Sequence, residues 1–194
     1  LQHAKDRGGA ADGIFVVDQA ARIAGLALAT FGATVLLRHD PVETDTEPDP
    51  RDDLSGMDVA RKALILARMM GFRGDLKDVT VESLVPSAFR TMPLPTFLAT
   101  LSKQDAAWTA RFAAATKQGR VLRYVLNASP RKVEVGLRAV PLTHPLAGLR
   151  GTDNQIVFTT VRYREHPLVI TGPGAGPAVT AAGVLNDILQ LTPS

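Results

Sequence analysis

Two alternating segments joined by a short turn constrain the fold of this sequence more than any other feature. Apolar and polar side chains alternate in residues 120–127 and again in residues 132–140, which is typical of strands with one buried face. Residues 128–131, Ala-Ser-Pro-Arg, have the composition of a turn. The pattern therefore predicts an antiparallel hairpin in the second half of the chain.

The rest of the pattern mixes strands with helices. Further strands are predicted at residues 14–17, 79–84, 155–163 and 168–171, and helices at residues 58–71, 94–101, 105–117 and 177–191. A loop that contains a single histidine, His144, separates the hairpin from the later strands. These elements predict an α+β fold with a mixed, largely antiparallel sheet and helices on one face.

Composition excludes several classes of protein. The 194 residues are enough for one good core, and 45% of them are hydrophobic while 21% are charged. The net charge is only +3 and the two signs are interspersed, so no basic face indicates a nucleic-acid partner. There is no cysteine, which excludes disulfide scaffolds and thiolate metal sites and is compatible with a cytoplasmic enzyme.

Residues 1–46 are expected to form a separate N-terminal segment with a strand and a helix. The glycines of residues 8–13 lack both the spacing and the preceding strand of a dinucleotide loop. Residues 23–37 carry no charge, but the run is shorter than the roughly 20 apolar residues of a membrane span and Arg22 and Arg38 bracket it. A buried helix with a following strand is therefore favoured over a membrane helix.

Residues 47–62, Glu-Pro-Asp-Pro-Arg-Asp-Asp-Leu-Ser-Gly-Met-Asp-Val-Ala-Arg-Lys, concentrate acids ahead of a helix. The two prolines predict an extended backbone up to Leu54, and Ser55 is a candidate helix N-cap with Asp58 at the capping-box position. Asp58 and Lys62 are then one turn apart on the same helix face. By itself this pattern indicates a capped helix with a surface ion pair, and no histidine is spaced to make the acids a metal site.

A glycine segment, residues 171–180, lies between the last strand and the last helix. This order can bring backbone N–H groups to an anion. As a dinucleotide fingerprint it fails, because Pro177 stands at the third glycine position. From spacing alone a close-packing turn is favoured.

Taken together, these segments resemble the homoserine dehydrogenases, in the form found in bifunctional aspartokinase–homoserine dehydrogenase proteins. Residues 47–62 resemble the signature of that family, and three later segments agree with it in order. The later segments are Gly-Arg-Val-Leu-Arg-Tyr at 119–124, Gly-Thr-Asp-Asn at 151–154 and Gly-Pro-Gly-Ala-Gly at 172–176. The resemblance covers about residues 47–194 and implies a catalytic domain at 47–176, followed at 177–194 by a helix that returns to a nucleotide domain.

The resemblance implies reduction of aspartate 4-semialdehyde to homoserine with NADP or NAD, in threonine and methionine biosynthesis. Glu47 would bind the substrate ammonium, and Asp53 would line the pocket. Lys62 would exchange the proton at the reacting oxygen, with Asp58 keeping it charged and oriented. Gly174 and Gly176 would pass close to the cofactor. A homodimer is expected, with neither membrane nor nucleic acid as partner.

The front end of the chain departs from the family pattern. A complete nucleotide-binding domain is not recognisable in residues 1–46, which are too few for one. Two hypotheses follow: a catalytic region that turns over its substrate, or a truncated domain that binds substrate or dimerises without turnover.

Overall fold

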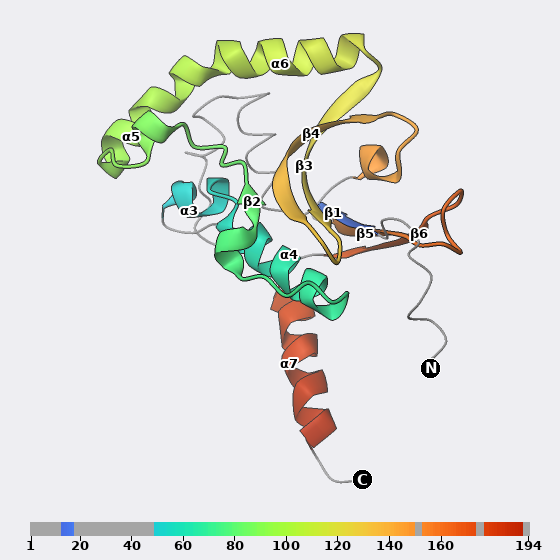
Figure 1. Cartoon of the computed structure of the whole chain (residues 1–194). Helices are drawn as coiled ribbons and strands as arrows, with labels where there is room; N and C mark the ends of the chain where they lie inside the picture. The colour runs from blue at the N-terminus through green and yellow to red at the C-terminus, as the bar shows by residue number, and fades with distance from the viewer. Residues whose placement is uncertain (1–12, 18–48, 150–152, 174–176, 192–194) are drawn as a thin grey trace.

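The computed structural model describes residues 13–17, 49–149, 153–173 and 177–191, and they form one curved sheet with helices, of which all but the last gather around it (Figure 1). The strands are β1 (Gly13–Val17), β2 (Thr80–Val81), β3 (Arg120–Ala128), β4 (Val133–Pro141), β5 (Asp153–Thr159) and β6 (Leu168–Pro173). The α-helices are α3 (Pro50–Leu54), α4 (Met57–Met69), α5 (Leu94–Thr100), α6 (Asp105–Lys117) and α7 (Pro177–Leu191). Among these residues no helix is long and apolar enough to cross a membrane.

The sheet confirms the predicted α+β class. Its strand order is β2-β4-β3-β1-β5-β6, and every neighbouring pair is antiparallel except β2 and β4, which are parallel. The predicted hairpin is β3 and β4, paired from Arg120 with Pro141 to Ala128 with Val133. The predicted N-terminal strand is β1, which lies between β3 and β5 near the middle of the sheet. The buried helix and following strand predicted from the uncharged run at residues 23–37 lie outside the described residues.

The main core lies between α4 and one face of the sheet. The buried residues of α4 are Val59, Ala60, Ala63, Leu64 and Ala67, and those facing them from the hairpin are Tyr124, Leu126, Ala128, Val133 and Val135. Three of the five helical residues are alanines, so the helix axis can approach the strands closely. On β5, Ile156 and Phe158 pack against the same cluster. The other face is covered at Val125 and Val157 by Leu146 of the 3₁₀ turn η5 (Pro145–Gly148) and by Leu149.

The chain between Asp49 and Leu54 is helical, so the predicted extended backbone there is wrong. Asp49 has extended dihedrals and caps α3 by accepting a hydrogen bond from the backbone N–H of Arg51 at 2.9 Å. Pro50 occupies the first helical turn, where its missing N–H has no cost and its fixed φ favours the helix. The proline that limits Asp49 to an extended conformation therefore also starts the next helix.

Two predicted strands also have different limits in the structure. Only Thr80 and Val81 of the strand predicted at 79–84 pair with a neighbour, namely β4. β5 begins at Asp153 and ends at Thr159, earlier at both ends than predicted. Asp153 and Asn154, the described residues of the Gly-Thr-Asp-Asn segment, are therefore the start of a strand.

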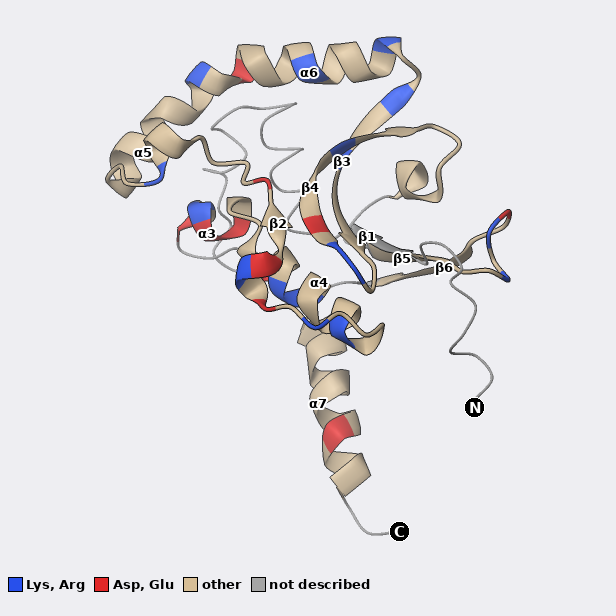
Figure 2. Ribbon diagram, in the orientation of Figure 1, with Lys and Arg blue, Asp and Glu red and all other residues tan. Residues whose placement is uncertain are grey.

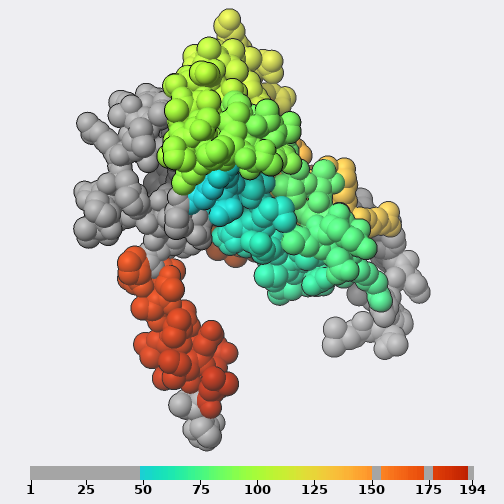
Figure 3. All heavy atoms as spheres, turned by 90° about the vertical axis from the view of Figure 1, so that its left-hand side faces the viewer, coloured from blue at the N-terminus to red at the C-terminus, as the bar shows by residue number. Residues whose placement is uncertain are grey.

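α7 extends away from the rest of the protein, and all of its residues are exposed (Figures 1 and 3). Its large apolar residues include Val184, Leu185 and Ile188, each more than half exposed. Figure 2 shows how little charge the helix carries compared with α4 and α6.

Candidate functional site

An ion pair on the exposed side of α4 joins the two residues that the sequence placed on one helix face. The Nζ atom of Lys62 lies 2.8 Å from Oδ2 of Asp58. Both side chains are about half exposed, at 49% for Lys62 and 55% for Asp58. Asp58 is in the first turn of α4, where the helix dipole favours a carboxylate. The pair is thus formed as predicted and remains accessible to a ligand.

A glycine, not the predicted Ser55, caps α4. Ser55 follows the end of α3, and its hydroxyl accepts a hydrogen bond from the backbone N–H of Met57 at 3.1 Å. Gly56 is the N-cap and has a φ of 77°, in the left-handed region. This conformation turns the chain sharply from α3 into α4 and brings Asp53 and Asp58 onto adjacent helices. The sequence pattern was misleading because Ser55 is already the C-cap of the short helix α3.

Asp58 and Lys62 project from the exposed face of α4, opposite the buried stripe that packs on the sheet. Nearer the β2 edge of the helix, Met57 lines an open pocket of about 330 Å³ together with Val81 of β2. Arg68 binds Asp75, which precedes β2, at 2.7 Å. The pair of Asp58 and Lys62 is therefore open to solvent and not turned toward the strands.

Three of the segments singled out in the sequence lie in one row across the sheet. Val125 and Gln155 both pair with Val17, so the residues that precede them, Tyr124 of β3 and Asn154 of β5, lie at one level of the sheet. Asn154 in turn pairs with Gly172 of β6. The phenol of Tyr124 lies directly under Gly56, whose Cβ, if present, would be 1.9 Å from the Tyr124 oxygen. Tyr124 is therefore the member of this row that lies under the start of α4.

The other predicted site residues are only partly within the described region. Asp53 lies on α3 and is half-buried. Glu47, Gly174 and Gly176 lie outside the described residues. Within the described ranges no three histidines or acids are grouped in a way that could hold a metal ion.

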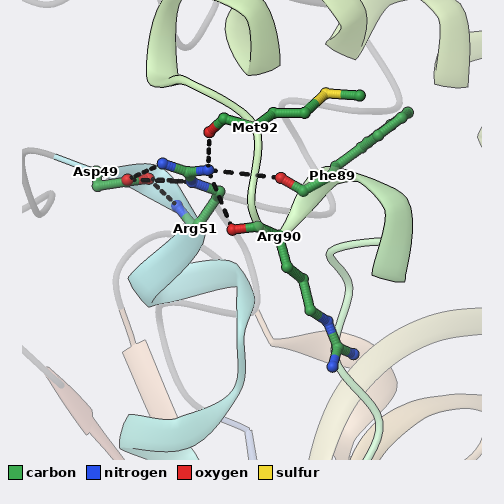
Figure 4. A network of polar contacts seen from close by, with 5 residues as sticks. All are labelled: Asp49, Arg51, Phe89, Arg90 and Met92. Carbon is green, nitrogen blue, oxygen red and sulfur yellow. Dashed lines mark hydrogen bonds and ion pairs between the residues drawn. The ribbon is translucent and has the colours of Figure 1, made fainter.

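Asp49 is held in a structural network (Figure 4). The Arg51 side chain donates two hydrogen bonds from Nε to the Asp49 carboxylate, at 3.0 and 3.1 Å, and forms an ion pair with it through its terminal nitrogen. The same guanidinium donates to the backbone carbonyls of Phe89, Arg90 and Met92. The hydrogen bond from Arg51 lowers the pKa of Asp49. Asp49 therefore orients Arg51, and Arg51 holds the segment that precedes α5 against α3.

His144 likewise has a structural contact. Its Nδ1 accepts a hydrogen bond from the backbone N–H of Leu146 at 3.2 Å, and burial lowers its pKa. Both observations favour a neutral imidazole that caps η5.

Tyr124 connects the start of α4 to the core, and its ionisation makes the stability of the protein depend on pH. Its hydroxyl donates a hydrogen bond to the Glu82 carbonyl at 2.7 Å, and burial, with the nearby Glu82 charge, raises its pKa to about 12. Because the folded pKa exceeds the ordinary value of 10.0, the contribution of protonated Tyr124 to stability is complete below pH 10 and is lost as pH rises through 12.

We expect the free energy of unfolding, measured with urea, to fall more steeply between pH 10 and 12 in the unmodified protein than in Tyr124→Phe. An equal pH dependence of the free energy of unfolding in the two proteins would contradict the assignment of this effect to Tyr124.

The geometry supports chemistry at a carbonyl or hydroxyl oxygen. An accessible ammonium held by a carboxylate can stabilise a developing alkoxide or deliver a proton to it. The same pair on a bare helix surface would contribute only a few tenths of a kcal/mol to stability. What distinguishes this pair is its place near the start of α4, which the close contact of Gly56 with Tyr124 fixes on the sheet.

The family model and the relatives that match this chain all point to one family. A sequence model described as homoserine dehydrogenase matches residues 34–189. A maize protein named bifunctional aspartokinase/homoserine dehydrogenase 2, chloroplastic, is 50% identical over 149 residues, covering 75% of this chain and 16% of the relative. An Emericella nidulans homoserine dehydrogenase is 44% identical over 154 residues, covering 75% of this chain and 42% of the relative. The chain thus spans less than half the length of these relatives.

Solved structures agree in fold. A crystal structure of a Candida auris protein of unknown function has a TM-score of 0.79 at 35% identity, covering 94% of this chain and 54% of that one. A putative homoserine dehydrogenase from Archaeoglobus fulgidus has a TM-score of 0.64 at 24% identity, with 94% and 51% covered.

Proposed function

This chain belongs to the homoserine dehydrogenase family, and we propose that it is the substrate-binding and catalytic region of an enzyme that reduces aspartate 4-semialdehyde to homoserine. The observation that carries the proposal is the 2.8 Å ion pair of Lys62 with Asp58 on the exposed face of α4, near its start, within the segment that resembles the family signature. An aldehyde that accepts hydride develops negative charge on its oxygen, and a fixed ammonium is suited to stabilise and protonate that oxygen.

Each predicted residue has a role in this proposal. Lys62 exchanges the proton with the substrate oxygen, and Asp58 holds the ammonium charged and in place. Glu47 binds the substrate ammonium, and Asp53 lines the same polar pocket. These roles follow the family pattern, since a substrate with an ammonium group requires carboxylates around it.

A nicotinamide cofactor, NADP or NAD, supplies the hydride when it is bound. Gly174 and Gly176 are proposed to lie against it, and the neighbouring Gly172 supports this assignment. A Cβ added at Gly172 would have no described heavy atom within 4 Å, so the described part of the chain leaves this glycine uncovered.

The proposal also covers the packing of this chain on a nucleotide-binding domain and on a second copy of itself. The exposed apolar surface of α7 is suited to pack on a nucleotide-binding domain of the complete protein. β6 is an edge strand with exposed Leu168, Val169 and Ile170, which supports a homodimer formed through the sheet. A cytoplasmic location is also proposed, although the maize relative is named chloroplastic.

Two measurements on the full chain test the function. First, homoserine is titrated in a calorimeter, and we expect saturable binding because the residues proposed to contact the substrate lie within this chain. Second, NADPH is added with aspartate 4-semialdehyde and its oxidation is followed. Turnover supports the autonomous enzyme. Homoserine binding without NADPH binding at millimolar cofactor supports the truncated alternative, and absence of homoserine binding contradicts the proposed function.

A further inference from the structure

An open pocket at the β2 edge of α4 takes no part in the proposed substrate site. Its volume is about 330 Å³, which is within the range of small-molecule sites. The side chains that line it come from two segments, residues 51–57 and residues 81–90. Met57, Val81 and Val85 give it an apolar wall, and the rest of the lining consists of two arginines and two serines. The pocket therefore combines apolar surface with a few hydrogen-bonding groups, as ligand sites do.

The charge at this pocket is positive. None of the described residues that line it is acidic. Glu82 lies within the second segment, but it is not a lining residue and its carboxylate pairs with Arg138 at 3.1 Å. Of the two lining arginines, Arg51 is neutralised by its ion pair with Asp49. Among the described residues, the guanidinium of Arg90 is therefore left at the pocket without a counter-charge.

Arg90 also has hydrogen-bond donors to offer a ligand. The Arg51 guanidinium is bound to Asp49 and to backbone carbonyls, whereas the Arg90 side chain points away from that network (Figure 4). Within the described part of the chain, the Arg90 guanidinium donates a single hydrogen bond, from Nε to the Val85 carbonyl at 3.5 Å. Both of its terminal nitrogens are left as donors. Two parallel N–H donors of this kind match two oxygens of a carboxylate or phosphate group.

The hydroxyl of Ser83 is a second donor within the pocket. It accepts a hydrogen bond from the backbone N–H of Val85 at 3.1 Å, and it donates to the Val85 carbonyl only at 3.4 Å. Because hydroxyl hydrogen bonds are usually about 2.7–2.8 Å long, turning this proton toward a ligand loses little. Ser55, the other lining serine, already donates to the Asp52 carbonyl at 2.6 Å. Ser83 and Arg90 are therefore the groups best suited to bind an anion.

The pocket is separate from the ion pair of Asp58 and Lys62. Met57, which lines the pocket, is five residues before Lys62, or about 140° away around the helix axis. Asp53, Asp58 and Lys62, the described residues assigned to the substrate, are not lining residues of this pocket. A ligand bound in the pocket would therefore not compete with homoserine.

We infer that this pocket is a second binding site, for a small organic anion whose carboxylate or phosphate group is held by Arg90 and Ser83 and whose apolar part packs on the wall of Met57, Val81 and Val85. The inference goes beyond the proposed function and does not depend on it, because it uses none of the residues assigned to turnover. A ligand that binds only the folded chain also stabilises it, so occupancy raises the melting temperature.

The experiment titrates two pairs of anions into the full chain by calorimetry, with sodium chloride keeping the ionic strength constant. The pairs are acetate with butyrate and inorganic phosphate with ethyl phosphate, and the members of each pair differ by two carbons. The pair that binds more tightly identifies the anionic group. Within that pair, the longer anion is expected to bind about tenfold more tightly, because its two further carbons reach the apolar wall.

Substitutions of two exposed arginines show where the anion binds. Arg90→Gln should weaken binding of the preferred anion at least tenfold, and Arg90→Lys, which keeps the charge without the paired donors, should weaken it less. Arg131→Gln is the matched control, because Arg131 is exposed, lies in the turn between β3 and β4, and is not a lining residue. It removes the same charge and should bind the anion like the unmodified chain.

Four results would overturn the inference while leaving the proposed function intact. The first is the absence of saturable binding by any of the four anions, and the second is equal affinity for both members of the preferred pair. The third is an equal effect of Arg90→Gln and Arg131→Gln, which would indicate general attraction of anions to a basic protein. The fourth is displacement of the anion by homoserine, which would place the anion in the substrate site.

Discussion

Replacing Lys62 with alanine is expected to lower the rate of NADPH oxidation with aspartate 4-semialdehyde by about 10²- to 10⁴-fold, the usual contribution of a positioned proton donor. The substitution should barely change stability. Lys62 is 49% exposed, and its pair with Asp58 is a single helix-surface interaction worth less than about 1 kcal/mol. A large loss of turnover with an unchanged melting temperature would therefore separate a catalytic role from a structural one.

Arg68→Ala is the matched control for this result. It breaks a comparable exposed ion pair, with Asp75 at 2.7 Å, near the other end of the same helix. Its turnover should equal that of the unmodified chain. Asp58→Asn leaves Lys62 in place without its carboxylate and should reduce turnover less than Lys62→Ala does. Retained turnover in Lys62→Ala would refute Lys62 as the proton donor, and an equal loss in Arg68→Ala would indicate damage to α4 instead.

The sequence predicts those parts of the fold that depend on periodicity. The β3–β4 hairpin and α4 were predicted close to their observed limits because alternation and the helical repeat reflect burial on one side. The pairing of Asp58 with Lys62 was also predicted, since residues four apart on a helix are neighbours whatever the rest of the chain does.

The parts that the sequence did not predict depend on contacts between distant segments. Ser55 has the character of a helix cap, but α3 precedes it, and α3 is held through Arg51 to carbonyls that follow much later in the chain. β2 is only two residues long, and its parallel pairing with β4 has no local signal. The alignment of Tyr124, Asn154 and Gly172 in one row follows from the position of β1 between β3 and β5, which no local pattern encodes.

Replacing Gly56 with alanine is expected to be the most damaging single change near the site. A residue other than glycine at a φ of 77° costs about 1–2 kcal/mol. In addition, the new Cβ would lie 1.9 Å from the Tyr124 oxygen and 3.2 Å from Cγ1 of Val81. Tyr124 is buried and hydrogen-bonded to Glu82, so relief requires loss of that bond or a shift of α4, at a further cost of about 1–3 kcal/mol. We expect urea unfolding to show a total loss of about 2–5 kcal/mol.

Gly119→Ala separates the two causes, because it introduces the same backbone strain without the contact. Gly119 has a φ of 63°, and nothing lies within 4 Å of the position its Cβ would take. It should therefore lose only about 1–2 kcal/mol. Because Gly56 fixes the start of α4 over Tyr124, Gly56→Ala should also weaken homoserine binding under conditions where it is still folded, whereas Gly119→Ala should not. Equal destabilisation by the two variants would mean that α4 does not depend on its close contact with Tyr124, and the site would then need another support.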